Sequence, residues 1–270
     1  MKQKFISGRN NALIAEICKL KQKKYRNRTG LFYVEGVKLL KEALSSEYKK
    51  NIKYIIAEEN IAGEIAGQAR NDGGFNDGWF NFDITVVTTE VYKKITDEEA
   101  FQGVMCVLEK PGKAAVLSYE KPVVILSSVR DPGNIGTIIR TAYAICDIDI
   151  ILSDDCADIY SGKTQRAAMG AIFRQNIKIS ENLQEDIENL KKKGYNIIAA
   201  HLDKNSRKIN DIKFNSKTAV IFGNEGTGID NKTAELCDEK MIIPINKNSE
   251  SLNVSVAAGI VLWEMGKRKI

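Results

Sequence analysis

The chain has 270 residues, of which 43% are apolar and 28% are charged, a balance typical of globular proteins. No run approaches the roughly 18 apolar residues of a membrane-spanning helix, and the basic N-terminus lacks the apolar core of a signal peptide. We therefore expect a cytoplasmic protein without a membrane segment, and the length favours two compact domains of unequal size.

The cysteines argue against a metal site. The five cysteines are an odd number, lie far apart and include no Cys-x-x-Cys pair. A structural zinc site needs closely spaced ligands, so we expect reduced thiols and no metal.

Positive charge is concentrated at the N-terminus. The first 28 residues contain nine Lys or Arg and one Glu, whereas the whole chain carries a net charge of only +5. Leu13, Ile17 and Leu20 recur at helical spacing, which predicts an amphipathic helix over residues 8–28. Its outward charges suit a phosphate backbone, although any solvated helix face would look similar.

The next hundred residues predict a small α/β domain. Strand-like runs occur at residues 31–35, 52–57, 84–87 and 104–108, with a helical stretch at 37–44. Residues 71–81 are rich in Gly, Asn and Asp and predict an exposed loop. Because Pro111 and Gly112 interrupt the pattern, we place this domain at residues 1–112, followed by a linker at 113–120.

Residues 121–270 predict a second α/β domain. Short apolar runs occur at residues 123–126, 148–152, 177–179, 197–200, 219–222 and 241–243. Most are separated by helix-length segments. Such runs are typical of parallel strands buried on both faces, so we expect a parallel sheet covered by helices.

Ligands of open parallel sheets bind beyond the carboxyl ends of the strands, and four polar junctions lie at such ends. The first, residues 131–136, reads Asp-Pro-Gly-Asn-Ile-Gly, and Asn134 is positioned to cap a helix that carries Arg140. The second is Ser-Gly-Lys-Thr at residues 161–164. A phosphate-binding loop would need glycine at position 157, which is Ala157, so we exclude a nucleotide hydrolase.

The third junction, residues 223–228, reads Gly-Asn-Glu-Gly-Thr-Gly. Its glycine spacing is not that of dinucleotide-binding folds, but glycines allow the backbone to approach a ligand closely. The fourth runs from Ile-Pro at residue 243 to Ser-Leu-Asn-Val-Ser at 251–255, where one polar residue caps the C-terminal helix. The single histidine, His201, ends the strand at 197–200 and is either a catalytic base or a surface residue without a function.

Three of these segments, in this order, resemble the signature motifs of the SpoU, or TrmH, family of RNA ribose methyltransferases. They are Asn-x-Gly-x-x-x-Arg at 134–140, Gly-Asn-Glu-Gly-x-Gly at 223–228, and Ile-Pro followed by Ser-Leu-Asn-Val-Ser at 243–255. The resemblance includes Gly-Ala-Ile-Phe at 170–173 and covers residue 121 to the end. The N-terminal part resembles the L30e-like substrate-binding domain of many members.

The resemblance implies a SPOUT α/β domain with a trefoil knot that binds S-adenosylmethionine, and a homodimer formed through the knotted domain. The implied cofactor contacts are Ala200, Gly223, Asn224, Gly226, Ile243, Ser251, Leu252 and Asn253. The implied catalytic residues are Arg140, Asn134, Glu225, Ser251 and Asn253. The candidate RNA contacts are Lys23, Lys24, Arg26, Arg28, Arg140, Arg166 and Arg174.

The expected activity is 2′-O-methylation of ribose in 23S ribosomal RNA. A transfer RNA ribose methyltransferase, a base methyltransferase and a non-catalytic RNA-binding or ribosome-assembly protein of the same fold are the alternatives. Because a guanidinium stays protonated in proteins, we expect Arg140 to clamp the target phosphate rather than to act as the base.

Overall fold

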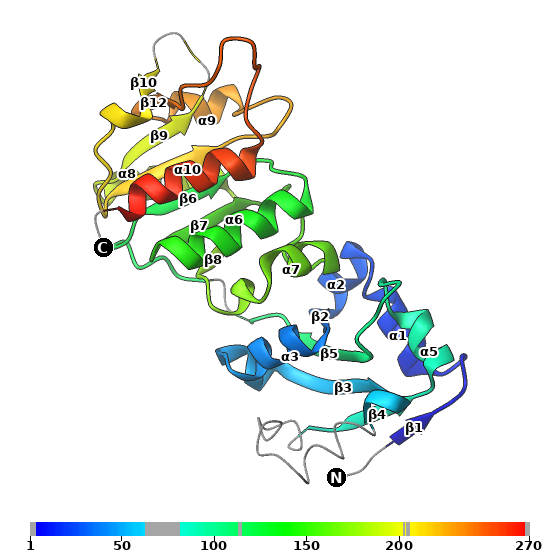
Figure 1. Ribbon diagram of the computed structural model, residues 1–270. Helices are drawn as coiled ribbons and strands as arrows, with labels where there is room; N and C mark the ends of the chain where they lie inside the picture. The colour runs from blue at the N-terminus through cyan, green and yellow to red at the C-terminus, as the bar shows by residue number, and fades with distance from the viewer. Residues whose placement is uncertain (1–3, 63–81, 113–114, 202, 204–205, 268–270) are drawn as a thin grey trace. The chain divides into compact units, whose positions relative to one another are not determined.

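The computed structural model describes residues 4–62, 82–112, 115–201, 203 and 206–267 (Figure 1). Contacts divide the chain into two compact units, Met1–Lys113 with Tyr160–Phe173, and Ala114–Ile159 with Arg174–Ile270. The segment Tyr160–Phe173 thus groups with the N-terminal unit, whereas the sequence places it within the second domain. The loop expected at 71–81 lies outside the described residues.

A five-stranded sheet forms the centre of the N-terminal unit. In spatial order its strands are β1 (Lys4–Ile6), β4 (Ile84–Val87), β3 (Ile52–Glu58), β5 (Val104–Glu109) and β2 (Leu31–Glu35). β5 is antiparallel to β3 and β2, and the other pairs are parallel. The four strands expected from the sequence are confirmed to within one residue, whereas no pattern indicates the short edge strand β1.

The helical segments of this unit pack on the sheet. They are α1 (Ala12–Lys19), α2 (Lys23–Thr29), α3 (Val37–Leu44), η1 (Glu47–Asn51), α5 (Thr89–Ile95), α7 (Gly162–Ala168) and η3 (Ala171–Phe173). The single helix expected over residues 8–28 is therefore wrong, because Gln22 adopts an extended conformation and separates α1 from α2. Ile14 and Ile17 of α1, with Tyr92 of α5, belong to one core cluster that includes Tyr33 of β2.

The segment Tyr160–Phe173, which includes α7 and is called the α7 segment below, covers the edge strand β2. Gln165, which is 1% exposed, donates from Nε2 to the carbonyl oxygens of Tyr33 and Tyr160, both at 3.0 Å. The ring of Tyr160 lies 4.6 Å from that of Phe32, the β2 residue that points to the opposite face from Tyr33. An uncovered edge strand presents unpaired backbone groups, so this segment protects the sheet where it would otherwise end.

Seven parallel strands form the sheet of the second unit. Their spatial order is β10 (Arg207–Lys208), β12 (Glu239–Ile242), β9 (Asn196–Ala200), β11 (Thr218–Phe222), β6 (Val123–Leu126), β7 (Asp149–Ser153) and β8 (Ile177–Ser180). The six strands expected from the sequence are confirmed to within two residues. From β6 the chain adds β7 and β8 on one side and then crosses to β9, so the order of strands reverses beside β6 and β11. Ligands of such sheets bind where the order reverses.

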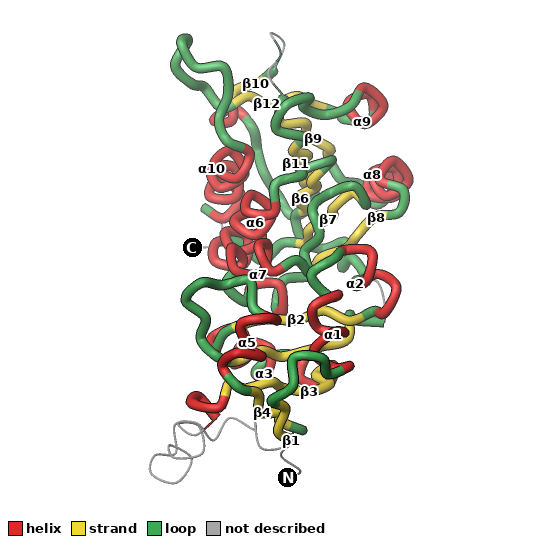
Figure 2. Tube along the Cα trace, turned by 90° about the vertical axis from the view of Figure 1, so that its right-hand side faces the viewer, coloured by secondary structure: helices red, strands yellow, loops and turns green. Residues whose placement is uncertain are grey.

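Helices cover both faces of this sheet, as the buried strands predict. α6 (Pro132–Ile145) and α10 (Val254–Gly266) pack side by side on one face, and α8 (Leu183–Lys192) and α9 (Asn231–Glu235) lie on the other (Figure 2). A short turn, η4 (Ile209–Asp211), follows β10. Among the described residues, no helix is long and apolar enough to cross a membrane.

The buried amide of Gln165 gives a test of how firmly the α7 segment is held. Replacing Gln165 with Leu leaves the carbonyl groups of Tyr33 and Tyr160 without this donor, so we expect the free energy of unfolding to fall by about 1–3 kcal/mol. Urea denaturation followed by circular dichroism measures this change. The control is Gln22→Leu, because Gln22 is exposed and makes no capping hydrogen bond. Equal midpoints for the two variants would contradict the proposed anchoring.

Candidate active site

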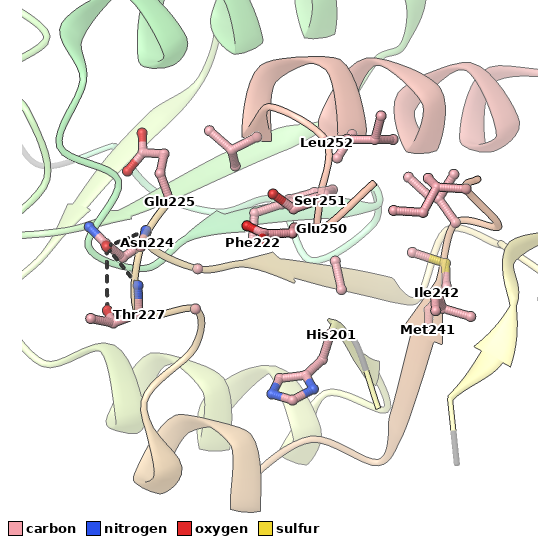
Figure 3. A pocket seen from close by; sticks show the side chains of 18 residues that line it. His201, Phe222, Asn224, Glu225, Thr227, Met241, Ile242, Glu250, Ser251 and Leu252 are labelled. Carbon is pink, nitrogen blue, oxygen red and sulfur yellow. Dashed lines mark hydrogen bonds between the residues drawn. The ribbon is translucent and has the colours of Figure 1, made fainter. Parts of the chain in front are cut away.

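A cavity of about 480 Å³ opens beyond the carboxyl ends of β9, β11 and β12 (Figure 3). Its walls come from the residues that follow these strands and from the segment that enters α10. The lining residues are Ala200, His201, Phe222, Gly223, Asn224, Glu225, Gly226, Thr227, Gly228, Met241, Ile242, Ile243, Ile245, Glu250, Ser251, Leu252, Val254 and Ala257. The volume lies within the range of small-molecule sites, and the mixture of apolar side chains with polar loop groups is typical of them.

Glycine at position 223 is required by the packing of the loop. A Cβ atom on Gly223 would lie 2.3–2.4 Å from the backbone of Gly228 and Ile229, which is closer than real Cβ contacts. The loop therefore folds back directly against the end of β11. In contrast, a Cβ on Gly226 would meet nothing closer than 3.5 Å.

Asn224 holds the same loop in shape. Its Oδ1 accepts from the backbone amides of Gly226 (2.9 Å) and Thr227 (3.1 Å), and its Nδ2 donates to the carbonyl oxygen of Ser128 (2.8 Å). Ser128 lies just after β6 and adopts a left-handed conformation with φ of 58°. The Asn224 side chain thus ties the loop after β11 to the loop after β6.

Three motif residues that lie far apart in the sequence form a chain of hydrogen bonds. Asn253 Nδ2 donates to Asn134 Oδ1, and Asn134 Nδ2 donates to Glu225 Oε1, both at 3.0 Å. Asn253 Oδ1 accepts from the amides of Ser255 and Val256, so Asn253 is the residue that caps α10. Each amide group is oriented by a partner on either side, which fixes the loops relative to one another.

The sequence assigns the cap of α6 to the wrong residue. The side chain of Asp131 accepts from the Asn134 amide and caps the helix, and Asn134 lies within its first turn. Because Asp131 satisfies that amide, the carboxamide of Asn134 can link Asn253 to Glu225.

The remaining predicted site residues are distributed as follows. Every predicted cofactor contact lines the cavity except Asn253, which lies between the lining residues Leu252 and Val254. Arg140 is an exposed residue of α6 outside the lining, and among the described residues no hydrogen bond or ion pair to its side chain is found. Its guanidinium is therefore available to a ligand.

Three polar lining residues, His201, Thr227 and Glu250, were not among the predicted cofactor contacts or catalytic residues. His201 directly follows β9, and its Nδ1 atom is buried without a hydrogen-bond partner. Glu250 precedes Ser251 in the segment that enters α10. The sequence marks His201 only as the single histidine at the end of a strand, and Glu250 only by its position next to Ser251. Among the described residues, no group of three or more His, Cys, Asp or Glu side chains could hold a metal ion.

Among the predicted RNA contacts, Arg26 and Arg166 are engaged within the protein. Arg26 is 3% exposed, and its guanidinium donates to the carbonyl oxygens of Leu20 (2.8 Å) and Lys21 (2.9 Å), which follow α1. Backbone carbonyls at a helix end need such donors, so Arg26 serves the fold. Arg166 forms an ion pair with Glu98 at 2.7 Å.

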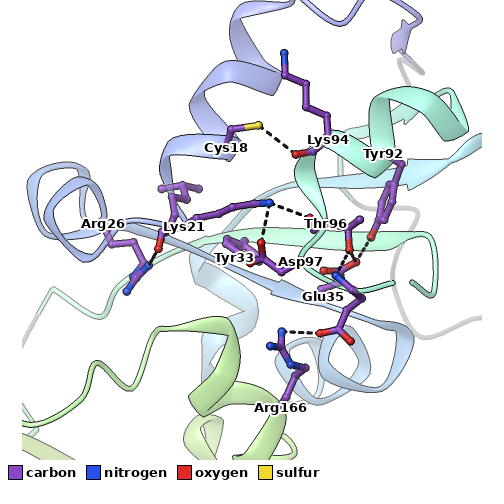
Figure 4. A network of polar contacts seen from close by, with 12 residues as sticks. Cys18, Lys21, Arg26, Tyr33, Glu35, Tyr92, Lys94, Thr96, Asp97 and Arg166 are labelled. Atoms are coloured by element: carbon purple, nitrogen blue, oxygen red, sulfur yellow. Dashed lines mark hydrogen bonds and ion pairs between the residues drawn. The ribbon is translucent and has the colours of Figure 1, made fainter. Parts of the chain in front are cut away.

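These two arginines belong to a wider polar network in the N-terminal unit (Figure 4). Lys21 Nζ lies 2.8 Å from Asp97 Oδ1, and the Tyr33 hydroxyl donates to Asp97 Oδ2 at 2.6 Å. Burial alone would raise the pKa of Asp97, but the hydrogen bonds from Lys21 and Tyr33 hold it below its ordinary value. Burial raises the pKa of the neighbouring Glu35 carboxyl. The network fixes the loop that follows α5.

The other predicted RNA contacts lie at the surface. Lys23, Lys24 and Arg28 are exposed on α2, and the Arg28 guanidinium stacks 4.7 Å from the centre of the Tyr25 ring. Arg174 is exposed in the second unit and lines a second cavity of about 360 Å³.

The fold and the cavity define a class of protein before any relative is considered. A parallel sheet carries its ligand pocket on loops that contain glycine and asparagine, and a chain of hydrogen bonds joins the first turn of α6, the loop after β11 and the start of α10. This is a parallel α/β domain that binds a small molecule at the carboxyl ends of its strands.

Comparison with known families identifies the class more closely. Residues 121–263 match the SpoU rRNA Methylase family, and residues 11–106 match the MRM3-like substrate binding domain. The chain therefore belongs to the SpoU family of RNA methyltransferases and carries a substrate-binding domain at its N-terminus. The α/β fold class, the N-terminal substrate-binding domain and the family expected from the sequence are confirmed.

One relative and one solved structure match nearly the whole chain, and a second relative matches about half of it. The chain is 31% identical over 265 residues to the 23S rRNA (guanosine(2553)-2'-O)-methyltransferase RlmP of Bacillus subtilis, which covers 98% of this chain and 99% of the relative. It is 30% identical over 150 residues to the tRNA (guanosine(18)-2'-O)-methyltransferase of Escherichia coli, covering 54% and 63%. The crystal structure of an AdoMet-bound rRNA methyltransferase from Sinorhizobium meliloti superposes with a TM-score of 0.82 at 29% identity, covering 99% and 98%.

The two glycines of the loop after β11 form a matched pair for a stability test. We expect Gly223→Ala to lower the free energy of unfolding by about 1–3 kcal/mol, because the new methyl group would overlap the backbone of Gly228. Gly226→Ala should change it by less than about 0.5 kcal/mol. Chemical denaturation of both variants measures the difference. If both variants lost the same free energy of unfolding, the loop would be able to accommodate a methyl group at position 223, and the prediction would be wrong.

Proposed function

We propose that this protein transfers the methyl group of S-adenosylmethionine to a ribose 2′-hydroxyl of 23S ribosomal RNA. The observation that carries the proposal is the hydrogen-bonded chain from Asn253 through Asn134 to Glu225 beside the cavity, because it joins the three motifs into one site. The RlmP protein of Bacillus subtilis spans the whole chain, whereas the Escherichia coli tRNA methyltransferase covers 54% of it. This difference favours ribosomal RNA over transfer RNA.

The lining of the cavity fits S-adenosylmethionine. Phe222, Ile243 and Leu252 offer apolar surface on which an adenine ring would pack, and backbone groups of the loop 223–228 would meet the polar parts of the cofactor. The predicted contacts Ala200, Asn224, Gly226 and Ser251 line the same space. Because the backbone of Gly228 and Ile229 lies so close to Gly223, only glycine fits at this position of the loop.

The chemistry requires alignment and the removal of one proton. S-adenosylmethionine supplies a methyl group on a positively charged sulfur. The ribose 2′-oxygen forms a bond to the methyl carbon while the carbon–sulfur bond breaks and leaves its electron pair on sulfur, and the hydroxyl proton departs. Holding both partners in line removes the entropic cost of their encounter. In our proposal Asn134, Asn253, Ser251 and Glu225 hold the loops that set this alignment.

Arg140 acts on the RNA in this proposal. An exposed guanidinium that has no partner among the described residues suits the bidentate recognition of a phosphate, and one oxygen of the target phosphate would accept the hydroxyl proton. We propose that Lys23, Lys24 and Arg28 on α2, together with Arg174, contribute further phosphate contacts. Arg26 and Arg166 are left out because the fold already uses their guanidinium groups.

We also propose a homodimer formed through the second unit. Val256 and Trp263 of α10 and Tyr143 of α6 are each 51% exposed, although all three are large apolar or aromatic residues. Burial of such residues against a second copy would remove apolar surface from water. The trefoil knot expected of the SPOUT fold involves the same C-terminal region.

We also propose a cytoplasmic location, because ribosomal RNA is the proposed substrate.

The reaction is tested by incubating the protein with radiolabelled S-adenosylmethionine and unmodified ribosomal or transfer RNA, followed by nucleoside analysis. We expect labelled 2′-O-methylnucleoside from 23S RNA. If only transfer RNA were labelled, the substrate would be transfer RNA. If the label were on a base, the protein would be a base methyltransferase. If the protein bound the cofactor but methylated neither naked RNA nor ribosomal particles, its role would be non-catalytic.

Arg140 gives the sharpest test of the proposed mechanism. Arg140→Lys should keep much of the RNA affinity but reduce the single-turnover rate by roughly tenfold to a hundredfold, because an ammonium cannot form the bidentate contact with the phosphate. Filter binding and rapid-quench methylation measure the two properties. Thr137→Ser, at another exposed position of α6, is the control. A full methylation rate in the lysine variant would rule out the phosphate clamp.

The dimer is tested at Trp263. We expect Trp263→Glu to shift the protein from dimer to monomer in analytical ultracentrifugation, because a buried carboxylate without a partner is unfavourable in an apolar interface. Lys213→Glu, which places the same acidic side chain at an exposed position before β11 and changes the net charge even more, should leave the mass unchanged. A monomeric wild-type protein, or an unaffected mass in the Trp263 variant, would contradict the proposed interface.

A further inference from the structure

The charges around the cofactor cavity are unbalanced. Among the described residues that line it, two are glutamates, Glu225 and Glu250, one is a histidine, and none is lysine or arginine. Lys240 is next in sequence to the lining residue Met241, but it does not line the cavity and its ammonium group lies 2.7 Å from Asp203 Oδ2. The lining therefore favours a ligand that carries positive charge.

The two glutamates differ in their surroundings. Glu225 accepts a hydrogen bond from Asn134 Nδ2 at 3.0 Å and is part of the chain that holds the loops together. For Glu250, no hydrogen bond or ion pair is found within the part of the chain that the structure describes, and the residue is exposed. Glu250 precedes Ser251 on the segment that connects β12 to α10, and Figure 3 labels both among the side chains that line the cavity. Its charge is thus free to act on a molecule in the cavity.

Methyl transfer changes the charge of the molecule that occupies this site. S-adenosylmethionine carries a positive sulfur, whereas the product S-adenosylhomocysteine has a neutral one and is otherwise the same molecule apart from the methyl group. The interaction of a carboxylate with the shared amino and carboxylate groups contributes equally to both affinities. The ratio of the two affinities therefore isolates the interaction with the charged sulfur.

We propose that Glu250 is a specificity-determining residue that favours the charged cofactor over its neutral product. This inference rests on the proposed function, because it takes S-adenosylmethionine as the occupant of the cavity. Once the methyl group has left, the attraction between Glu250 and the sulfur is lost, so the product is held less tightly and leaves the site more readily. Glu250 would act on the exchange of cofactor and product rather than on the transfer itself.

The test measures the dissociation constants of S-adenosylmethionine and S-adenosylhomocysteine by isothermal titration calorimetry on the full-length protein. Glu250→Gln should weaken the binding of S-adenosylmethionine about threefold relative to that of S-adenosylhomocysteine, the size of a single charge interaction at a hydrated site. Glu250→Lys should change the same ratio by roughly tenfold, since it alters the charge by two units. Both effects should diminish as salt is added.

Glu181→Gln is the matched control, because Glu181 is an exposed glutamate of the second unit that does not line the cavity. Its affinity ratio should equal that of the wild type. An equal loss for both ligands would place Glu250 against their shared part and overturn the proposal, as would an unchanged ratio in both Glu250 variants. If the wild-type protein binds neither ligand, the proposed function itself fails, which is a distinct result.

Discussion

The candidate active site depends on two carboxamide groups that are oriented by each other. Asn253 caps α10 with its oxygen and donates its amide nitrogen to Asn134, which in turn donates to Glu225. One contribution comes from the first turn of α6, one from the loop after β11 and one from the start of α10. Asn134 lies 91 residues before Glu225 and 119 before Asn253 in the chain, so the site exists only when the sheet brings these segments together.

The glycine-rich loop is held by a second set of constraints. Asn224 donates a hydrogen bond to Ser128, and Gly223 allows the loop backbone at Gly228 and Ile229 to lie directly against the end of β11. Backbone of the loop 223–228 and side chains such as Phe222 and Leu252 line the cavity together, and the hydrogen bonds of Asn224 hold this loop in place.

Most of the fold could be predicted from the sequence, because short apolar runs buried on both faces leave a clear pattern. The strands of the second sheet follow that pattern closely, and β1 and β10 escape it because they are only three and two residues long. The site residues could be recognised through their motifs, but the hydrogen bonds between them could not be predicted from the sequence. Nothing in the spacing of Asp131 and Asn134 says which of them caps α6, since both are good capping residues. The burial of Arg26 and the pairing of Arg166 with Glu98 depend on tertiary contacts that local sequence does not encode.

The segment Tyr160–Phe173 has a consequence for how the two units can be separated. It lies between β7 and β8 in the chain, yet its contacts belong to the N-terminal unit, so the polypeptide passes from one unit to the other three times. A single proteolytic cut near residue 113 would leave the C-terminal fragment still carrying a piece of the other unit's structure. The N-terminal domain of a relative could replace this one by recombination only if its strand equivalent to β2 still packs against Gln165 and Tyr160, which would come from the original chain. Substitutions in β2 and in the segment Tyr160–Phe173 must therefore remain compatible with each other.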